Sequence, residues 1–276
     1  MTLQNGKYWD VSFNPLRGCT HCSPGCDNCW AEDVDKRFNG GKDFDGTGPH
    51  FYPEVLDKLE HWKKPRKVFV CDMSDAFYWG VGSAVTENHL HQWEVFCAMK
   101  AHPRHQYLLL TKRAENMAYW SERWQGWWGG TPDNWWLGGT CENQEWADKR
   151  IQHLLQRRST GLCWASFEPL LDSVILDRRH LYCPTHDFNG GFYCGSCRDM
   201  RRLDWIVIGC ESGPRRRPCK LEWVDSLIRQ GKKMGIPVWV KQIEVKGKII
   251  KGLNQISNIL GYPAESLRQW PEKRQP

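Results

Sequence analysis

The sequence predicts an α/β protein built as a (β/α) barrel, complete or partial. Short and almost continuously apolar runs, such as VFVC, YLLL and WIVI, recur along the chain, and such runs are typical of strands covered on both faces of a parallel sheet. Segments of helical length and composition separate them. Because a sequence pattern cannot show whether a sheet closes, an open doubly wound sheet is the alternative.

Seven strands and five helices are expected in alternation. The strands are predicted at residues 8–13, 67–71, 106–110, 135–137, 162–167, 205–208 and 237–240. The helices are predicted at residues 30–38, 87–100, 113–123, 144–157 and 221–234. We therefore expect one domain over residues 1–276, in which residues 178–204 are an inserted metal-binding module and residues 244–276 are a C-terminal extension.

Composition excludes several classes of protein. No apolar run approaches the roughly 20 residues that a membrane helix needs, and MTLQNGKYWD has no signal-peptide pattern. We therefore expect a cytoplasmic protein without membrane contact. The 13 cysteines cannot all pair within one chain, so metal-bound, catalytic or buried thiols are expected. A net charge of +6 permits a nucleic-acid partner without requiring one.

Four cysteines lie close together after the first predicted strand, in the segment GCTHCSPGCDNCWAE. They are Cys19, Cys22, Cys26 and Cys29, a donor set that suits an iron–sulfur cluster or a structural zinc. The C-x3-C-x2-C spacing of Cys22, Cys26 and Cys29 is the signature of radical S-adenosylmethionine (SAM) enzymes. In those enzymes three thiolates leave one iron of a [4Fe–4S] cluster open for SAM. The loop falls at the strand ends where barrel enzymes build active sites.

The chain resembles a phage-associated three-cysteine-motif protein family of unknown function that is regarded as radical-SAM-like. The resemblance covers about residues 9–242 in the stretches NPLRGC, SPGCDNCWAE, KPRKVFVCDMSDAF, HQYLLLTKR, WLGGTCENQEWADKRI, SFEPLL, WIVIGCESGPRRRP and VWVKQ. The family pattern, C-x6-C-x2-C, falls on Cys19, Cys26 and Cys29, and Cys22 is then an extra thiol. We favour this triad over the one with Cys22. The resemblance also implies a radical-SAM-like barrel, an external electron donor and, if the protein is phage-encoded, the host cytoplasm.

Polar residues that follow the predicted strands are candidates for binding SAM or substrate. The candidate cofactor-binding residues are Ser74, Asp75, Thr111, Lys112, Glu142, Asn143 and Ser166. The glycines that usually receive the SAM amino group are absent, so Ser74 and Asp75 are candidates by position only. The simpler interpretations are that Glu142 and Asn143 cap the next helix, and that Lys112 and Arg113 belong to a solvated helix start.

Two glutamates are candidate catalytic residues. Glu168 and Glu211 each follow an apolar strand, where an unpaired carboxylate is costly to bury. Either could bind SAM, anchor the substrate or donate a proton, and the sequence does not choose among these roles.

A second cluster of ligands lies in CPTHDFNGGFYCGSC. Cys183 and His186 form a C-x2-H pair, and Cys194 and Cys197 form a C-x2-C pair. This is the ligand number and softness of tetrahedral zinc, so a structural zinc knuckle is expected. An auxiliary iron–sulfur cluster is the alternative.

Basic and aromatic residues indicate a nucleic-acid interface. Arg215, Arg216 and Arg217 follow the sixth predicted strand, and Arg113 follows the third; cations at a barrel mouth suit phosphates. WQGWWGG has too much glycine for a regular element, so Trp127 and Trp128 are expected in a loop that stacks on bases. A solvated surface or a protein partner are the alternatives.

These observations predict a radical SAM-type enzyme that abstracts hydrogen from a nucleic-acid base or modified nucleotide, as in DNA hypermodification. One alternative is a non-catalytic iron–sulfur or zinc protein that binds nucleic acid in phage regulation or defence. The other is a radical SAM enzyme that modifies a peptide or protein.

Overall fold

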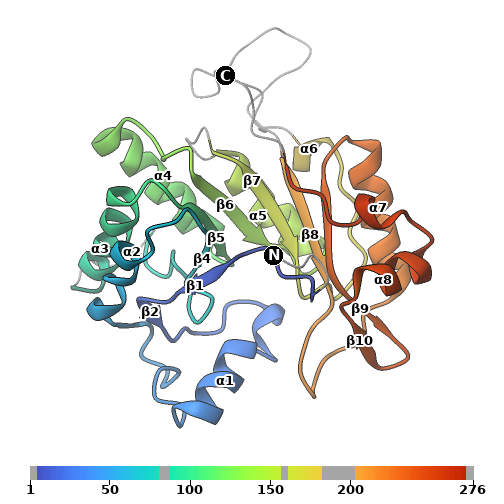
Figure 1. The fold of residues 1–276 in the computed structure, drawn as a ribbon, viewed down its shortest axis with the longest axis horizontal. Coiled ribbons are helices and arrows are strands. Elements are labelled where there is room, and N and C mark those ends of the chain that lie inside the picture. The colour runs from blue at the N-terminus through green and yellow to red at the C-terminus, as the bar shows by residue number, and fades with distance from the viewer. Residues whose placement is uncertain (1–4, 81–86, 157–160, 182–202, 272–276) are drawn as a thin grey trace, which may run out of the picture.

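A single eight-stranded sheet, largely parallel, organises the computed structural model, which describes residues 5–80, 87–156, 161–181 and 203–271 (Figure 1). The strands follow one another across the sheet in chain order, apart from β2 (Leu16–Arg17) and β3 (His50–Phe51), which pair separately. The strands of the large sheet are β1 (Val11–Phe13), β4 (Lys67–Val70), β5 (Gln106–Thr111), β6 (Trp135–Thr140), β7 (Cys163–Phe167), β8 (Trp205–Gly209), β9 (Val238–Val245) and β10 (Lys248–Ile250). All seven predicted strands are confirmed.

Strand order distinguishes between the two predicted architectures. The first seven strands pair in parallel with their neighbours in the chain, and only β10 is antiparallel. The order never reverses, so the doubly wound alternative is not seen. Within the described part of the chain the outer strands are β1 and β10, and a closed barrel is therefore not confirmed.

The five predicted helices are confirmed, and three short ones were not predicted. The helices are α1 (Trp30–Phe38), α2 (Lys58–His61), α3 (Glu87–Ala101), α4 (Ala114–Trp128), α5 (Gln144–Gln156), α6 (Arg178–Leu181), α7 (Leu221–Lys233) and α8 (Leu253–Leu260). In the part of the chain described, no helix has the length and apolar character needed to cross a membrane.

The prediction of a loop at WQGWWGG is wrong. Helix α4 continues through this segment and ends at Gly129, whose left-handed φ of 75° caps it. Trp124 is fully buried, and the ring of Trp128 stacks on the ring of Trp93 at 4.9 Å. Burying these rings outweighs the roughly 1 kcal/mol that one glycine costs inside a helix. Trp127 remains 55% exposed.

Alternate residues of strands β4 to β9 belong to two different cores. Val68 and Val70 pack in the larger core with the helices, whereas Phe69 between them packs in a second, aromatic core. The same alternation places Trp136, Trp164, Trp205 and Trp239 in the second core. Tyr8 packs against rings from β4, β7, β8 and β9, so the sheet curves around this side chain.

The segment predicted as a C-terminal extension is part of the fold. The predicted boundary at residue 244 falls inside β9, and the chain then adds β10 and α8. The Trp270 ring stacks on Trp205 with centroids 5.3 Å apart, and buried Arg268 donates to the carbonyls of Val240 and Lys251. The predicted zinc ligands Cys183, His186, Cys194 and Cys197 lie outside the described residues.

Candidate functional site

A cavity of about 360 Å³ lies at the carboxyl ends of the parallel strands, against the cysteine loop (residues 18–29). The residues that line it come mainly from the cysteine loop and from the segments at the carboxyl ends of the parallel strands. The predicted site residues that line it are Cys19, Cys26, Cys29, Ser74, Asp75, Thr111, Lys112, Arg113, Glu168 and Glu211. Those that do not are Cys22, Glu142, Asn143, Ser166, Arg215, Arg216, Arg217, Trp127 and Trp128.

The cysteine loop presents the three thiols of the C-x6-C-x2-C pattern to this cavity. Cys19, Cys26 and Cys29 line it, whereas Cys22 does not. Among the described residues, no group of three or more His, Cys, Asp or Glu side chains is placed so as to hold a metal ion. Three thiols suit an iron–sulfur cluster chemically, but as placed here they do not converge on one point.

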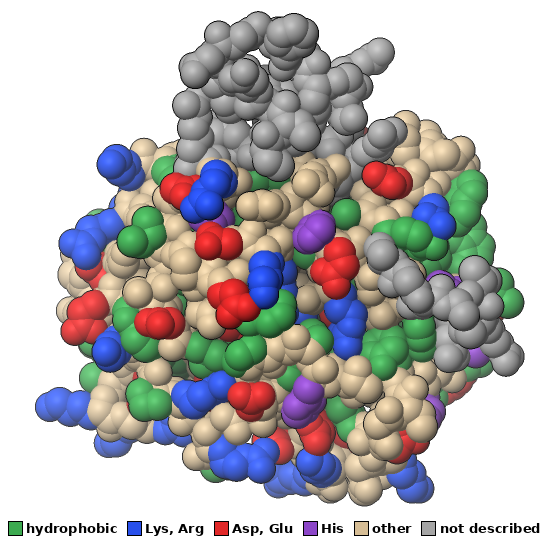
Figure 2. All heavy atoms as spheres, turned by 180° about the vertical axis from the view of Figure 1, so that it is seen from behind, with side chains coloured by type: hydrophobic (Ala, Val, Ile, Leu, Met, Phe, Trp, Pro, Cys, Tyr) green, Lys and Arg blue, Asp and Glu red, His purple; other side chains and the backbone are tan. Residues whose placement is uncertain are grey.

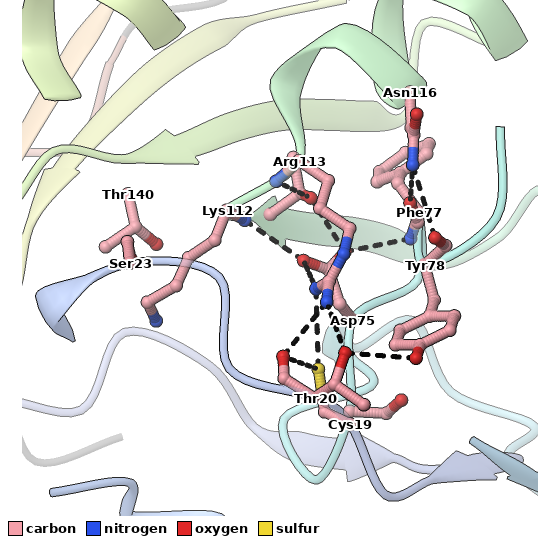
Figure 3. A network of polar contacts seen from close by, with 12 residues as sticks. Cys19, Thr20, Ser23, Asp75, Phe77, Tyr78, Lys112, Arg113, Asn116 and Thr140 are labelled. Atoms are coloured by element: carbon pink, nitrogen blue, oxygen red, sulfur yellow. Dashed lines mark hydrogen bonds and ion pairs between the residues drawn. The ribbon is translucent and has the colours of Figure 1, made fainter. Parts of the chain in front are cut away.

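Arg113 fixes the first end of the cysteine loop (Figure 3). Its guanidinium donates to the Cys19 sulfur at 3.4 Å and to the Thr20 carbonyl at 3.0 Å. Asp75 holds the same guanidinium at 3.4 Å, and the Tyr78 ring covers it at 4.5 Å. Burial raises the pKa of the Cys19 thiol to about 11, although the Arg113 charge acts in the opposite direction.

Asp75 is an internal organiser rather than a free carboxylate. It accepts hydrogen bonds from the Thr111 hydroxyl at 2.7 Å and from the Lys112 backbone N–H at 3.1 Å. Ser74 is also engaged, because its hydroxyl donates to the Gly18 carbonyl at 2.6 Å. The residues predicted to receive SAM by position thus hold the strand ends and the cysteine loop together.

Lys112 differs from these residues because its ammonium group has no such partner. Figure 3 shows its side chain extending toward Ser23 and Thr140 and away from Asp75, and no hydrogen bond joins its Nζ to any part of the chain that the structure describes. Burial alone would lower the pKa of Lys112, but the nearby Cys26 thiolate and the Glu142 carboxylate raise it above its ordinary value. Lys112 is therefore a cation that faces the cavity.

Glu142 contacts the middle of the cysteine loop at Ser23 and Gly25. It is fully buried and accepts 2.7 Å hydrogen bonds from the Ser23 hydroxyl and from Arg150, itself 2% exposed. A Cβ on Gly25 would lie 2.3 Å from the Glu142 carboxylate oxygen, so only glycine lets the loop approach this closely. Arg150, on α5, was not predicted. We call the set Ser23, Gly25, Glu142 and Arg150 the strut.

Two predicted cofactor-binding residues have other surroundings. The Asn143 side chain accepts a hydrogen bond from the Trp146 backbone N–H at 3.1 Å, which confirms the capping alternative for Asn143. The Ser166 hydroxyl is buried without a hydrogen-bond partner and does not line the cavity.

Both candidate catalytic glutamates are paired. Glu168 accepts a 2.5 Å hydrogen bond from the Lys241 ammonium group. Glu211 accepts two bonds from the Arg217 guanidinium, at 2.6 and 3.2 Å, and one from the Asn28 amide at 3.0 Å. Burial would raise the pKa of Glu211, but the hydrogen bonds from Arg217 and Asn28 hold it below its ordinary value.

The arginine loop (residues 215–217) clamps the other end of the cysteine loop. Arg217 also donates to Asp27 at 3.1 Å and to the Pro24 carbonyl at 2.8 Å. Arg215 pairs with Asp33 at 2.9 Å, and Arg216 donates to the carbonyls of Gly213 and Gly247. These cations are engaged within the chain, and Figure 2 shows both signs of charge interspersed on the face it presents.

Aromatic residues at the cavity were not predicted. Trp30 lines it and is 52% exposed; its position directly after Cys29 was the signal available in the sequence. Trp9 lines it with the Lys241 ammonium 5.5 Å from its ring.

Cys71, directly after β4, also lines the cavity, and its φ of 56° is left-handed. This conformation costs a non-glycine residue about 1–3 kcal/mol and is common at functional sites.

The model of one protein family, described as "Protein of unknown function (DUF5131)", matches residues 5–254. No curated protein matches the chain, and no solved structure matches it.

Proposed function

The chain belongs to DUF5131, a family of proteins of unknown function, and from the chemistry of its site we propose that it is a radical SAM-type enzyme. One observation carries the proposal: Cys19, Cys26 and Cys29 line one cavity at the carboxyl ends of parallel strands, and Cys22 does not. Enzymes with parallel sheets build their sites at this edge. The consecutive strand order and the curvature around Tyr8 support a partial (β/α) barrel.

The three thiolates would hold a [4Fe–4S] cluster, which supplies an open iron for SAM and the electron that cleaves it. Cluster loading requires the three side chains to turn toward a common point. Cys19 lies in residues 18–23, which form neither helix nor strand, whereas Cys26 ends a 3₁₀ helix (Pro24–Cys26) and Cys29 directly precedes α1. Three supports limit the movement: Arg113 at Cys19, the strut at Ser23 and Gly25, and Arg217 at Pro24.

The cavity lining supports a nucleotide base as the substrate. Trp9, Trp30 and Phe44 offer flat apolar surface, on which a base can stack for roughly 1–3 kcal/mol. Lys112 and Lys251 also line the cavity, and neither ammonium forms an ion pair among the described side chains. These cations suit a carboxylate or a phosphate. We therefore propose DNA-base or nucleotide modification as the reaction class.

The engagement of Ser74 and Asp75 favours a second candidate function. Both positions, where the SAM amino group would be received, are occupied by internal hydrogen bonds. A non-catalytic iron–sulfur protein that binds nucleic acid needs no such receptor. The two candidates differ in one measurable property, which is SAM cleavage.

Anaerobic reconstitution with iron, sulfide, SAM and a reductant tests the proposal. We expect about one four-iron cluster per chain and production of 5′-deoxyadenosine, and a cluster that never cleaves SAM would instead support the second candidate. Cys19→Ala should lose the cluster and Cys22→Ala should keep it. The reverse result would assign the cluster to the C-x3-C-x2-C triad. Zinc at the second cluster, also a proposal, should be lost in Cys194→Ala without loss of iron.

A further inference from the structure

A basic groove of about 350 Å³ lies at the amino ends of β1, β4, β5 and β6. It is formed by the residues that lead into these strands. They are Asp10, Pro65, Arg66, Lys67, Pro103, Arg104, His105, Gln106 and Asn134. Strands β4, β5 and β6, which run from this groove toward the cavity, are four to six residues long, which at about 3.3 Å per residue separates the two by roughly 13–20 Å.

The cations of the groove are not neutralised by neighbouring carboxylates. Arg66, Lys67 and Arg104 form no ion pair with any acidic residue in the described ranges. The carboxylate that lines the groove is that of Asp10, and its Oδ2 accepts the Lys67 backbone N–H at 2.7 Å. The groove therefore carries an excess of positive charge.

Trp62 holds both guanidinium groups in place. The Arg66 guanidinium lies 5.9 Å from the centre of the Trp62 ring, and Arg104 donates to the Trp62 carbonyl at 3.4 Å. Two side chains that rest on one residue lose less conformational freedom when they bind a ligand than two free surface arginines.

A buried donor beside the groove has no partner. The Arg66 Nε is buried without a hydrogen bond. A buried donor without a partner costs about 1–3 kcal/mol, and a bound ion or ligand would remove that cost. An anion is the ligand that would pair with this donor and with the excess charge together.

We propose that this groove is a phosphate-binding site, separate from the cavity and independent of the proposed radical chemistry. The planar guanidinium groups of Arg66 and Arg104 offer paired N–H donors, which match the oxygens of a phosphate monoester. Lys67 adds a point charge, and its ammonium lies 3.9 Å from the centre of the Trp270 ring. The Asp10 carboxylate repels a bound phosphate, so a variant that removes this negative charge should bind phosphate more tightly.

Isothermal titration of the full-length protein with inorganic phosphate and with a nucleoside 5′-monophosphate, at constant ionic strength, tests this site. We expect both to bind. The double variant Arg66→Gln/Arg104→Gln should weaken binding at least tenfold, whereas Asp10→Asn should tighten it. Lys149→Gln removes an exposed cation of α5 outside the groove and should leave the affinity unchanged.

Two results would overturn the proposal. One is equal affinity of the wild type and the double variant; the other is no change in Asp10→Asn, because a carboxylate in a phosphate site must oppose binding. If the double variant unfolds, Arg104→Gln alone, which removes an exposed side chain, still has to weaken binding. Cys26→Ala should bind phosphate like the wild type, so failure of the radical chemistry and failure of this site are distinguishable.

Discussion

Replacing Arg150 by methionine tests whether the strut supports the cysteine loop. Arg150 and Glu142 are 2% and 0% exposed, and their charged groups are 2.7 Å apart. Removing one partner of such a pair leaves a buried charge uncompensated, which costs about 3–5 kcal/mol. We therefore expect Arg150→Met and Glu142→Gln each to lower the free energy of unfolding by about 3 kcal/mol or more.

Urea denaturation followed by circular dichroism measures this loss. With a dependence of about 3 kcal/mol per M urea, the midpoint should fall by about 1 M in each single variant. The double variant Glu142→Met/Arg150→Met should recover most of the loss, because an apolar pair of similar volume leaves no buried charge. Lys149→Gln breaks an exposed pair with Glu145 and should cost less than about 0.5 kcal/mol.

The contact between Glu142 and Ser23 also predicts how well the cysteine loop retains iron. In the double variant the fold is restored but the Ser23 hydroxyl has lost its acceptor, so iron retention should fall although stability does not. A loss below about 1 kcal/mol in Arg150→Met, or a double variant that loses the sum of both single effects, would refute the reasoning.

Three further predictions follow from single contacts. Gly25→Ala places a Cβ 2.3 Å from Glu142 and should lower iron content after reconstitution, whereas Gly126→Ala, with open space around it, should not. The pKa of Glu211 is lowered in the folded protein, so its contribution to stability is present above its pKa in the unfolded chain, about 4.3, and is lost as pH falls through the folded value. The stability difference between the wild type and Glu211→Gln should therefore shrink between pH 6 and pH 3. A difference that stays constant over this range would contradict the prediction. Trp124→Ala should cost about 3–5 kcal/mol in thermal or urea unfolding, and a result as small as that for exposed Trp127→Gln, within about 0.5 kcal/mol, would contradict the assignment of this segment to α4.

The strand and helix positions were predictable because they depend on local periodicity. Runs such as VFVC and YLLL are apolar on both faces, since each strand from β4 to β9 contributes to both the helix-covered core and the aromatic core. WQGWWGG is one exception, because glycine indicated a loop there; the short helices α2, α6 and α8, which were not predicted, are others. Helix α4 continues through WQGWWGG because Trp124 and Trp128 pack into the core. The residues they pack against are distant in sequence, so the local sequence pattern does not show this contact.

The site was predictable where the ligands are close in sequence and not where pairs form across the fold. The spacing of Cys19, Cys26 and Cys29 gives a testable ligand set without any coordinates. That Glu211 is bound by Arg217, and that both then hold the cysteine loop, depends on loops that meet only at the edge of the sheet.

The sequence by itself determined the seven parallel strands, the five longest helices, their alternation and the loop that carries the thiols, because these depend on periodicity and on residues that are neighbours in the chain. Only the tertiary structure decided which predicted residues face the cavity. Glu142 belongs to the strut, the arginine loop holds the cysteine loop, and Lys112 is left facing the cavity. A charge takes its role from the partner that folding brings to it, and these partners lie up to 193 residues away along the chain.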